Sequence, residues 1–157
     1  MIVTELPDLE ATSALAARIA ALARPGDVIA LQGELGAGKT TLARAFIRAR
    51  GYTGEVPSPT FTMAQLYDLD DAPIWHFDAY RLRDPDEAWE LGIEDAFREG
   101  ISLIEWPERL GPLLPDRRLW ITLSDAGPPN ARRATLDPGL GPGGDWAERL
   151  AGLAMER

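Results

Sequence analysis

The sequence contains no cysteine and a single histidine among its 157 residues. Without cysteine, the chain can form no disulfide, no thiolate zinc site and no thiol nucleophile. One histidine cannot supply the clustered imidazole ligands of a zinc enzyme or a metalloprotease motif. Metal chemistry in this chain therefore depends on oxygen ligands, and Mg²⁺ is the leading candidate for such a site.

Positive charge is also scarce. The chain has 16 lysine and arginine residues against 25 aspartate and glutamate residues, which gives a net charge of −9. This balance argues against a protein that grips nucleic acid through a broad basic face. A local basic patch is still compatible with it, although an ordinary solvated strand edge is the simpler interpretation. The residues of that patch are Arg117, Arg118, Arg132 and Arg133.

Long apolar runs are missing as well. No stretch approaches the roughly 20 apolar residues of a membrane-spanning helix. The acidic opening MIVTELPDLEATSAL lacks the basic and apolar regions of a signal peptide. We therefore expect a cytoplasmic protein with no membrane partner. The 157 residues, 45% of them hydrophobic, are enough for one domain with a real core, residues 1–157, and too few for two ordinary domains.

The spacing of the apolar residues predicts an α/β fold, with a mostly parallel sheet flanked by helices. Strands are expected before residue 9, at 27–33 and 101–106, at two places within 60–80 around the turn 69–73, and at 117–124 and 132–137. Helices are expected at 9–24, at 39–51 and, as one or two short helices with Asp84 as N-cap, within 84–100. Residues 138–157 are predicted to form a Gly/Pro-rich loop and a short C-terminal helix.

The stretch GELGAGKTT at residues 33–41 fits the phosphate-loop pattern G-x-x-x-x-G-K-[ST]. Gly33 and Gly38 permit backbone conformations in which successive N–H groups face phosphate oxygens. Lys39, the only lysine of the chain, offers a compact charge to the β- and γ-phosphates, where the wide fork of arginine would not fit. Thr40 supplies a hydroxyl that can bind Mg²⁺. Chance matches in a chain of this composition number on the order of 10⁻³, so we expect nucleotide binding.

A reaction requires a further carboxylate that holds Mg²⁺ or positions a water molecule. Asp78 in IWHFD and Glu105 in ISLIE both end apolar strands, and either one can take this role. Ser58 and Thr60 in SPTFT are candidates for a switch segment that senses the γ-phosphate, with a plain Ser-Pro turn as the alternative. His76 is interpreted as a partly buried core histidine rather than a catalytic base.

Two other nucleotide-dependent classes fit less well. A regulatory GTPase reads guanine with N-K-x-D, which requires a second lysine, and the sequence contains no D-x-x-G either. A small-molecule kinase is the better rival, but it usually has an arginine-rich helical lid. After the loop helix, this chain instead continues into SPTFTMAQLYDL, which is typical of strands.

The ordered motifs GELGAGKTT, SPTFTM, HFDAYRL, ELGIEDAF and LIEWPERL resemble the TsaE family, formerly YjeE. These are bacterial ATPases needed to make threonylcarbamoyladenosine in tRNA. The likeness runs from the N-terminal helix to about Arg133. It implies a compact P-loop fold, ATP and Mg²⁺ as cofactors, and weak intrinsic hydrolysis.

The resemblance also implies roles for individual residues. The catalytic set is Lys39, Asp78 and Glu105, with Thr40 and Glu105 at the Mg²⁺ position. Arg133 is an alternative to Arg132 as the late nucleotide contact. The nucleotide-binding set is Thr12, Glu34, Leu35, Gly36, Ala37, Gly38, Lys39, Thr40, Thr41 and Arg132. Switch or partner contacts fall to Ser58, Thr60 and Trp106.

The family resemblance implies protein partners, namely the TsaB–TsaD pair, in which TsaD transfers the threonylcarbamoyl group to tRNA adenosine. The chain would then hydrolyse ATP to sustain repeated cycles, without carrying out the transfer, and would meet tRNA only through the complex. The alternative is a nucleotide-dependent binding module, in which ATP occupancy rather than turnover controls partner association.

Overall fold

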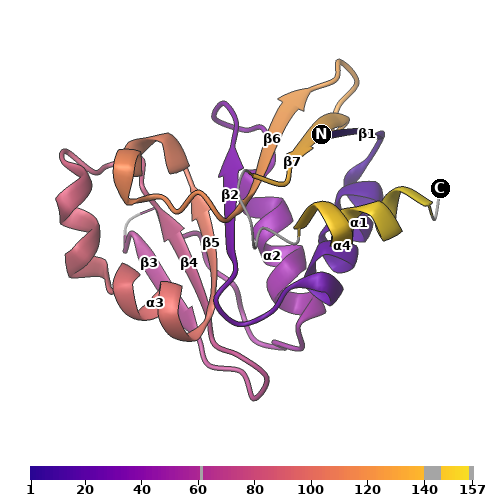
Figure 1. Ribbon diagram of the computed structural model, residues 1–157. Helices are drawn as coiled ribbons and strands as arrows, with labels where there is room; N and C mark the ends of the chain where they lie inside the picture. Colours follow the sequence, from indigo (N-terminus) through magenta and orange to yellow (C-terminus); the bar gives the residue numbers. More distant parts are fainter. Residues whose placement is uncertain (61, 140–145, 156–157) are drawn as a thin grey trace.

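The computed structural model describes residues 1–60, 62–139 and 146–155 (Figure 1). Its elements in chain order are β1 Ile2–Leu6, α1 Leu9–Leu22, β2 Val28–Gln32, α2 Lys39–Ala49, β3 Ala64–Tyr67, β4 Ile74–Asp78, the 3₁₀ helix η1 Pro85–Leu91, α3 Ile93–Glu99, β5 Ile101–Glu105, the 3₁₀ helix η2 Pro107–Leu113, β6 Leu119–Asp125, β7 Arg132–Asp137 and α4 Trp146–Met155. The alternation of helices and strands confirms the predicted α/β class.

The described strands form one seven-stranded sheet in the order β1-β7-β6-β2-β5-β4-β3. The central pairings, β6 with β2, β2 with β5 and β5 with β4, are parallel, as predicted. The outer pairings are antiparallel, so the sheet is mixed. Short connections account for two of these three pairings, because β3–β4 and β6–β7 are hairpins, whereas a parallel pair requires a long crossover. The carboxyl ends of β2, β4, β5 and β6 consequently meet at one edge.

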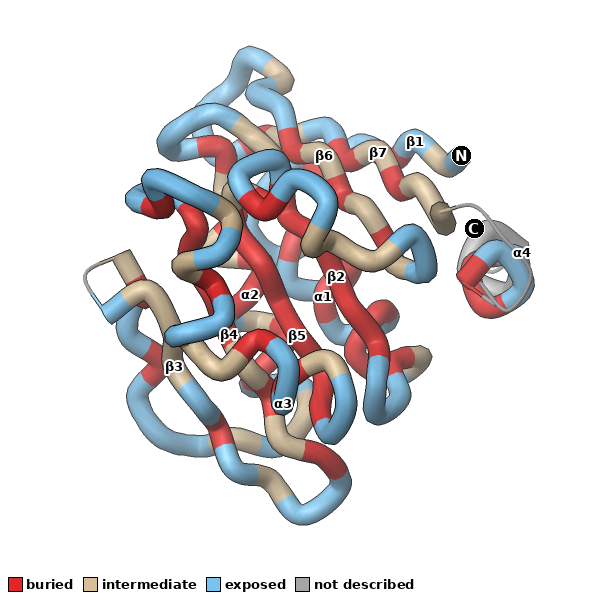
Figure 2. Tube along the Cα trace, turned by 60° about the vertical axis from the view of Figure 1, so that its left-hand side comes forward, coloured by how far each residue is buried: buried red, intermediate tan, exposed pale blue. Residues whose placement is uncertain are grey.

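Helices cover both faces of the sheet (Figure 1). One face packs against α1 and α2 through apolar side chains such as Ile19 and Phe46, both fully buried. The other packs against η1, α3 and η2, where Ile93 and Leu110 lie in the second core. Figure 2 shows β2 and β5 as buried chain in the middle of the molecule. Continuous burial of central parallel strands explains their unbroken apolar sequences.

Local signals in the sequence set most of the element boundaries. Asp8 caps α1 by accepting from the N–H of Ala11 at 2.8 Å, and α1 ends at Leu22, two residues before the predicted end. Asp84 is the N-cap of η1, as predicted, and forms a capping box with Glu87. Gly92, at φ 83°, separates η1 from α3. The helix η2 was not expected.

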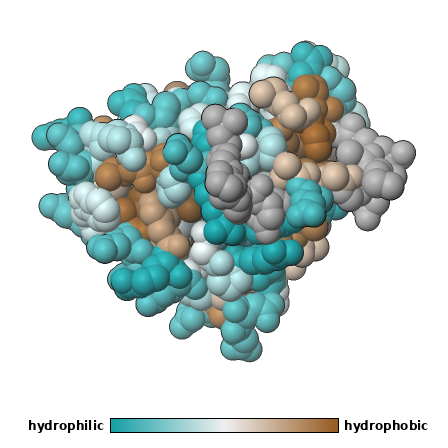
Figure 3. All heavy atoms as spheres, in the orientation of Figure 1, coloured by the Kyte–Doolittle hydropathy of each residue, from teal (hydrophilic) through white to brown (hydrophobic). Residues whose placement is uncertain are grey.

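The C-terminal prediction is tested only in part. The helix α4 is present at Trp146–Met155, but residues 140–145 of the predicted Gly/Pro-rich loop and the last two residues lie outside the described ones. Most of the face in Figure 3 is hydrophilic, and its apolar atoms form separate patches. Within residues 1–60, 62–139 and 146–155, no helix combines the length and the hydropathy needed to cross a membrane.

Candidate functional site

The loop from Gly33 to Thr40 joins β2 to α2 at the carboxyl edge of the parallel strands. A methyl group at Gly33 would come within 2.7 Å of the Leu123 carbonyl oxygen, so only glycine fits against β6 there. Gly38 is the N-cap of α2 and has φ 101°, a left-handed conformation that disfavours other residues. These two glycines let the chain turn sharply and begin α2 with its free N–H groups at this edge.

A cavity of about 350 Å³ lies beside the loop, a size within the range of small-molecule sites. It collects most of the predicted residues from distant parts of the chain. They are Thr12, Leu35, Gly36, Ala37, Gly38, Lys39, Thr40, Thr41, Thr60, Asp78, Glu105, Trp106 and Arg132. Glu34 and Ser58 are exposed and do not line it, although the Ser58 hydroxyl lies 2.7 Å from that of Thr60.

Lys39 is buried against the loop itself. Its ammonium group donates to the carbonyl oxygens of Gly33 and Glu34, the latter at 3.1 Å, and lies 3.8 Å from the ring centroid of Trp106. Burial lowers the pKa of Lys39 from its usual 10.5, and nearby carboxylates, Glu105 foremost, oppose that shift. A cation that has lost water in this way favours the arrival of an anion.

Glu105, at the end of β5, lies between two side chains that fix it. The Thr40 hydroxyl donates to its two carboxylate oxygens at 2.9 and 3.1 Å. His76 Nε2 lies 2.6 Å from Glu105 Oε2, and the imidazole is fully buried. The interpretation of His76 as a core residue is confirmed, although the ring is fully rather than partly buried and also contacts a carboxylate of the cavity. Its place two residues before Asp78, on the same strand face, was the available signal.

Asp78 stands directly opposite Glu105 in the parallel register of β4 and β5. Both carboxylates are buried, and Asp78 Oδ1 accepts from the Tyr80 N–H at 3.0 Å. Within the described ranges, no group of three or more His, Cys, Asp or Glu side chains could hold a metal ion. One hydroxyl and one carboxylate, Thr40 and Glu105, fit a Mg²⁺ ion that takes its remaining oxygens from a ligand and water.

Aromatic side chains form one wall of the cavity. Trp106 has φ 58°, which is uncommon for a residue other than glycine, and it directs its ring toward Lys39. The Tyr80 ring packs on it with the centroids 4.8 Å apart. Four further residues that line the cavity were not predicted from the sequence. Two of them follow Asp78 in the HFDAYRL motif, which was the available signal, and two carried none; they are Tyr80, Arg81, Leu9 and Asn130.

The chain is similar to known proteins in sequence and in overall structure. The family model described as threonylcarbamoyl adenosine biosynthesis protein TsaE matches residues 6–134. The tRNA threonylcarbamoyladenosine biosynthesis protein TsaE of Bacillus subtilis is 43% identical over 119 residues, which cover 75% of this chain and 74% of that protein. Its namesake from Synechocystis is 42% identical over 119 residues, with 71% and 73% covered. The crystal structure of Bacillus subtilis YdiB matches with a TM-score of 0.82 at 32% identity, over 99% of this chain and 95% of that one.

Proposed function

The chain belongs to the TsaE family, and from that premise we propose that it is a Mg²⁺-dependent ATPase that serves threonylcarbamoyladenosine synthesis in tRNA. One observation carries the catalytic part of this proposal. The Thr40 hydroxyl and the Glu105 carboxylate, 65 residues apart in sequence, meet at 2.9 Å beside the glycine-rich loop. The loop motif alone supports nucleotide binding, whereas this contact brings together oxygen atoms that would hold a Mg²⁺ ion.

Each buried polar group of the cavity has a role in this proposal. Lys39 exchanges the carbonyl oxygens of Gly33 and Glu34 for the oxygens of the β- and γ-phosphates. Thr40 and Glu105 would hold the metal, which would supply positive charge to stabilise the charge on the phosphate oxygens. Asp78, held by the Tyr80 N–H, faces the same cavity and orients the attacking water.

The partner side of the proposal rests on the family and on charge. We place the chain with the TsaB–TsaD pair, whose activity its ATP cycle sustains, and the transfer to tRNA stays with TsaD. A chain with a net charge of −9 has little means of holding tRNA by itself. Contact with tRNA is therefore indirect, through the complex.

The nucleotide assignment is tested by replacing the only lysine. Lys39→Ala is expected to weaken ATP binding by more than about 100-fold, because the phosphate oxygens lose a charge-assisted partner. Isothermal calorimetry with ATP and Mg²⁺ measures this directly. Arg48→Ala, which removes an exposed cation from the same helix, is the matched control and should bind ATP normally. Unchanged ATP affinity in Lys39→Ala would contradict the proposed role of this loop in nucleotide binding.

A second experiment separates turnover from occupancy. ATP hydrolysis is measured for the purified chain alone and with the TsaB–TsaD complex, and strong stimulation by the complex is expected. A non-hydrolysable ATP analogue should then stall repeated rounds of tRNA modification. Continued rounds with the analogue would instead support a binding module controlled by occupancy. ADP production that depends on an added metabolite, with no response to the complex, would favour a small-molecule kinase.

A further inference from the structure

The Arg132 side chain contacts the Gly33–Thr40 loop, although the two are far apart in the sequence. Arg132 is the first residue of β7, and because β7 runs antiparallel to β6, it lies at the same edge as the loop. Arg132 Nε donates to the Ala37 carbonyl at 2.9 Å, and Nη2 donates to the Gly36 carbonyl at 3.0 Å. Nη1 donates to the Ala131 carbonyl at 2.8 Å. Each nitrogen of the guanidinium group is thus engaged by a backbone carbonyl.

Those contacts dictate how the loop peptides face. A trans peptide is planar, so its carbonyl and its N–H point in opposite directions. When Arg132 holds the Ala37 carbonyl, the N–H of Gly38 points away from Arg132. The side chain also packs over Gly38, since a Cβ there would lie 3.6 Å from Arg132 Nε. Left free, a loop with glycines at 36 and 38 would sample many peptide orientations, some with carbonyl oxygens directed at an incoming anion.

We propose that Arg132 is a positioning residue, which locks the Gly36 and Ala37 carbonyls outward and so keeps the loop ready for phosphate. This inference rests on the proposed nucleotide function of the loop. It adds a role to the direct nucleotide contact implied by the family resemblance, because three of the five N–H groups of Arg132 are used on backbone carbonyls. Two different nitrogens of one planar group hold the Ala37 and Gly36 carbonyls, and the single ammonium nitrogen of lysine does not reproduce that geometry.

The test compares Arg132→Ala, Arg132→Lys and Arg133→Ala. Arg133, the alternative nucleotide contact suggested by the sequence, does not line the cavity; it is exposed and pairs with Glu5 at 2.6 Å. Arg133→Ala therefore removes the same charge without altering a contact to the loop. Hydrogen–deuterium exchange of the nucleotide-free protein reports on residues 33–40, with β2 and β5 as internal reference. Calorimetry then gives the affinity for ATP with Mg²⁺.

We expect faster exchange confined to the loop in both Arg132 variants, and ATP affinity lowered about tenfold or more in both, since each lost charge-assisted hydrogen bond is worth a factor of that order. Arg133→Ala should match the unmodified chain. Unchanged loop exchange in Arg132→Ala, or full affinity in Arg132→Lys, would overturn the clamp in favour of a direct phosphate contact. Faster exchange throughout the chain would also overturn it, by showing a global structural role. Failure of the unmodified chain to bind ATP would count against the proposed function, and the exchange result would still report on the clamp.

Discussion

The two ends of the parallel strands each bury a carboxylate, but they compensate it differently. Asp27, just before β2, is 7% exposed and meets the Arg149 guanidinium at 2.6 and 3.2 Å. Glu105, at the end of β5, is 3% exposed and meets a hydroxyl and an imidazole. The charge of Asp27 is already compensated by a bidentate cation. The Glu105 carboxylate, held by Thr40 and His76, can still bind a cation. Stability and chemistry are therefore concentrated at opposite ends of one sheet.

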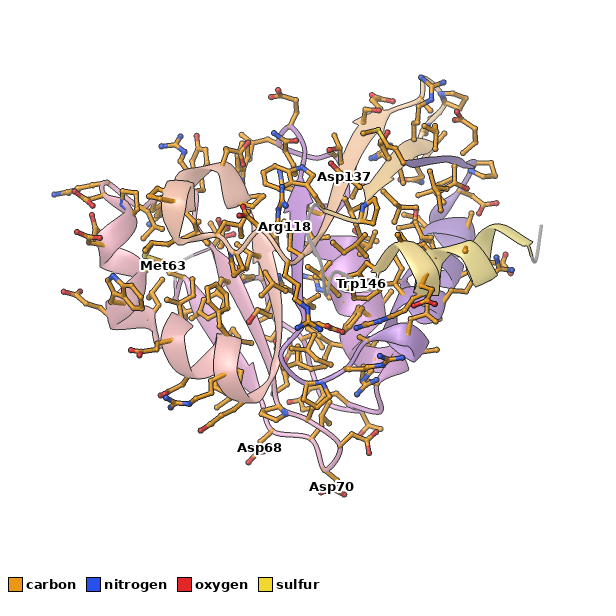
Figure 4. The ribbon with its side chains drawn as sticks, viewed as in Figure 1. Met63, Asp68, Asp70, Arg118, Asp137 and Trp146 are labelled. Atoms are coloured by element: carbon orange, nitrogen blue, oxygen red, sulfur yellow. The ribbon has the colours of Figure 1, made fainter. Side chains whose placement is uncertain are left out.

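The C-terminal helix closes the end of the sheet at Asp27, which is called the stabilising end below; the end at Glu105 is called the chemical end. Trp146 on α4, labelled in Figure 4, is 1% exposed, and Arg149 lies 4.3 Å from its ring centroid. Arg149 also donates to the Leu22 carbonyl at the end of α1, and Asp27 accepts from the Arg24 N–H at 2.6 Å. This network ties α1, β2 and α4 together. The family model, which matches residues 6–134, does not cover α4.

Glu105→Gln gives the largest predicted effect and tests the chemical end. We expect ATP hydrolysis to fall by about 10²–10⁴-fold, the usual contribution of a positioned catalytic carboxylate, and Mg²⁺-dependent ATP affinity to fall by a smaller factor of about 10–100. Thermal stability should be retained, because the amide can still accept from Thr40. Steady-state ADP release and calorimetry measure the two quantities. Glu108→Gln, a neighbouring exposed carboxylate bonded to Gln32, is the control. Normal turnover in Glu105→Gln would place the catalytic carboxylate elsewhere.

Arg149→Met tests the opposite end. It leaves Asp27 buried without its guanidinium, which should cost about 3–5 kcal/mol of unfolding free energy. ATP affinity of the folded protein should not change, because the ion pair lies at the far end of the sheet from the cavity. Urea unfolding measures the loss, and Arg98→Ala, which breaks an exposed pair with Asp95, should cost less than about 1 kcal/mol. Adding Asp27→Asn to Arg149→Met should restore part of the stability. A weaker ATP affinity in Arg149→Met would show that the two ends are coupled.

The third prediction concerns how firmly the chemical end holds its carboxylate. His76→Leu removes the imidazole beside Glu105 and should weaken Mg²⁺-dependent ATP binding about 10–100-fold, as loss of a partner that orients a metal ligand does. His76→Gln offers an amide N–H to Glu105 Oε2 and should recover part of that loss. Calorimetric ATP titrations at a series of Mg²⁺ concentrations distinguish the two variants. Identical Mg²⁺ dependence of ATP binding in both variants and the parent chain would show that His76 does not orient a metal ligand.

Local patterns predicted the fold class and the loop, and failed where partners are distant in sequence. Gly33, Gly38 and Lys39 stand within one short motif, so their chemistry is readable without a structure. The contacts of Glu105 with His76 and of Arg132 with Ala37 span 29 and 95 residues. The Asp27–Arg149 pair spans 122. Only strand order and register bring such residues together, and these depend on tertiary packing that local propensity does not encode.

The smallest predicted effect concerns the stabilising end and the free energy of unfolding. It tests the cost of burying one hydroxyl group there without a hydrogen-bond partner. Tyr67, the last residue of β3, pairs with Ile74 and is buried, and its hydroxyl has no hydrogen-bond partner among the described residues. Tyr67→Phe removes that hydroxyl, so we expect a gain in unfolding free energy of about 1 kcal/mol, with no change in ATP affinity.

The gain in unfolding free energy from Tyr67→Phe should also depend on pH. Burial, followed by Tyr52, raises the pKa of Tyr67 above 10.0. The folded state therefore binds the phenolic proton more tightly than the unfolded state, and this contribution is full below pH 10.0 and is lost as pH rises through the folded pKa. Urea unfolding above pH 10.0 should thus show the advantage of Tyr67→Phe growing. An advantage independent of pH would mean that the phenol reaches water in the folded protein. The stabilising end would then be open as well, and the contrast with Glu105 would reduce to the Asp27–Arg149 pair alone.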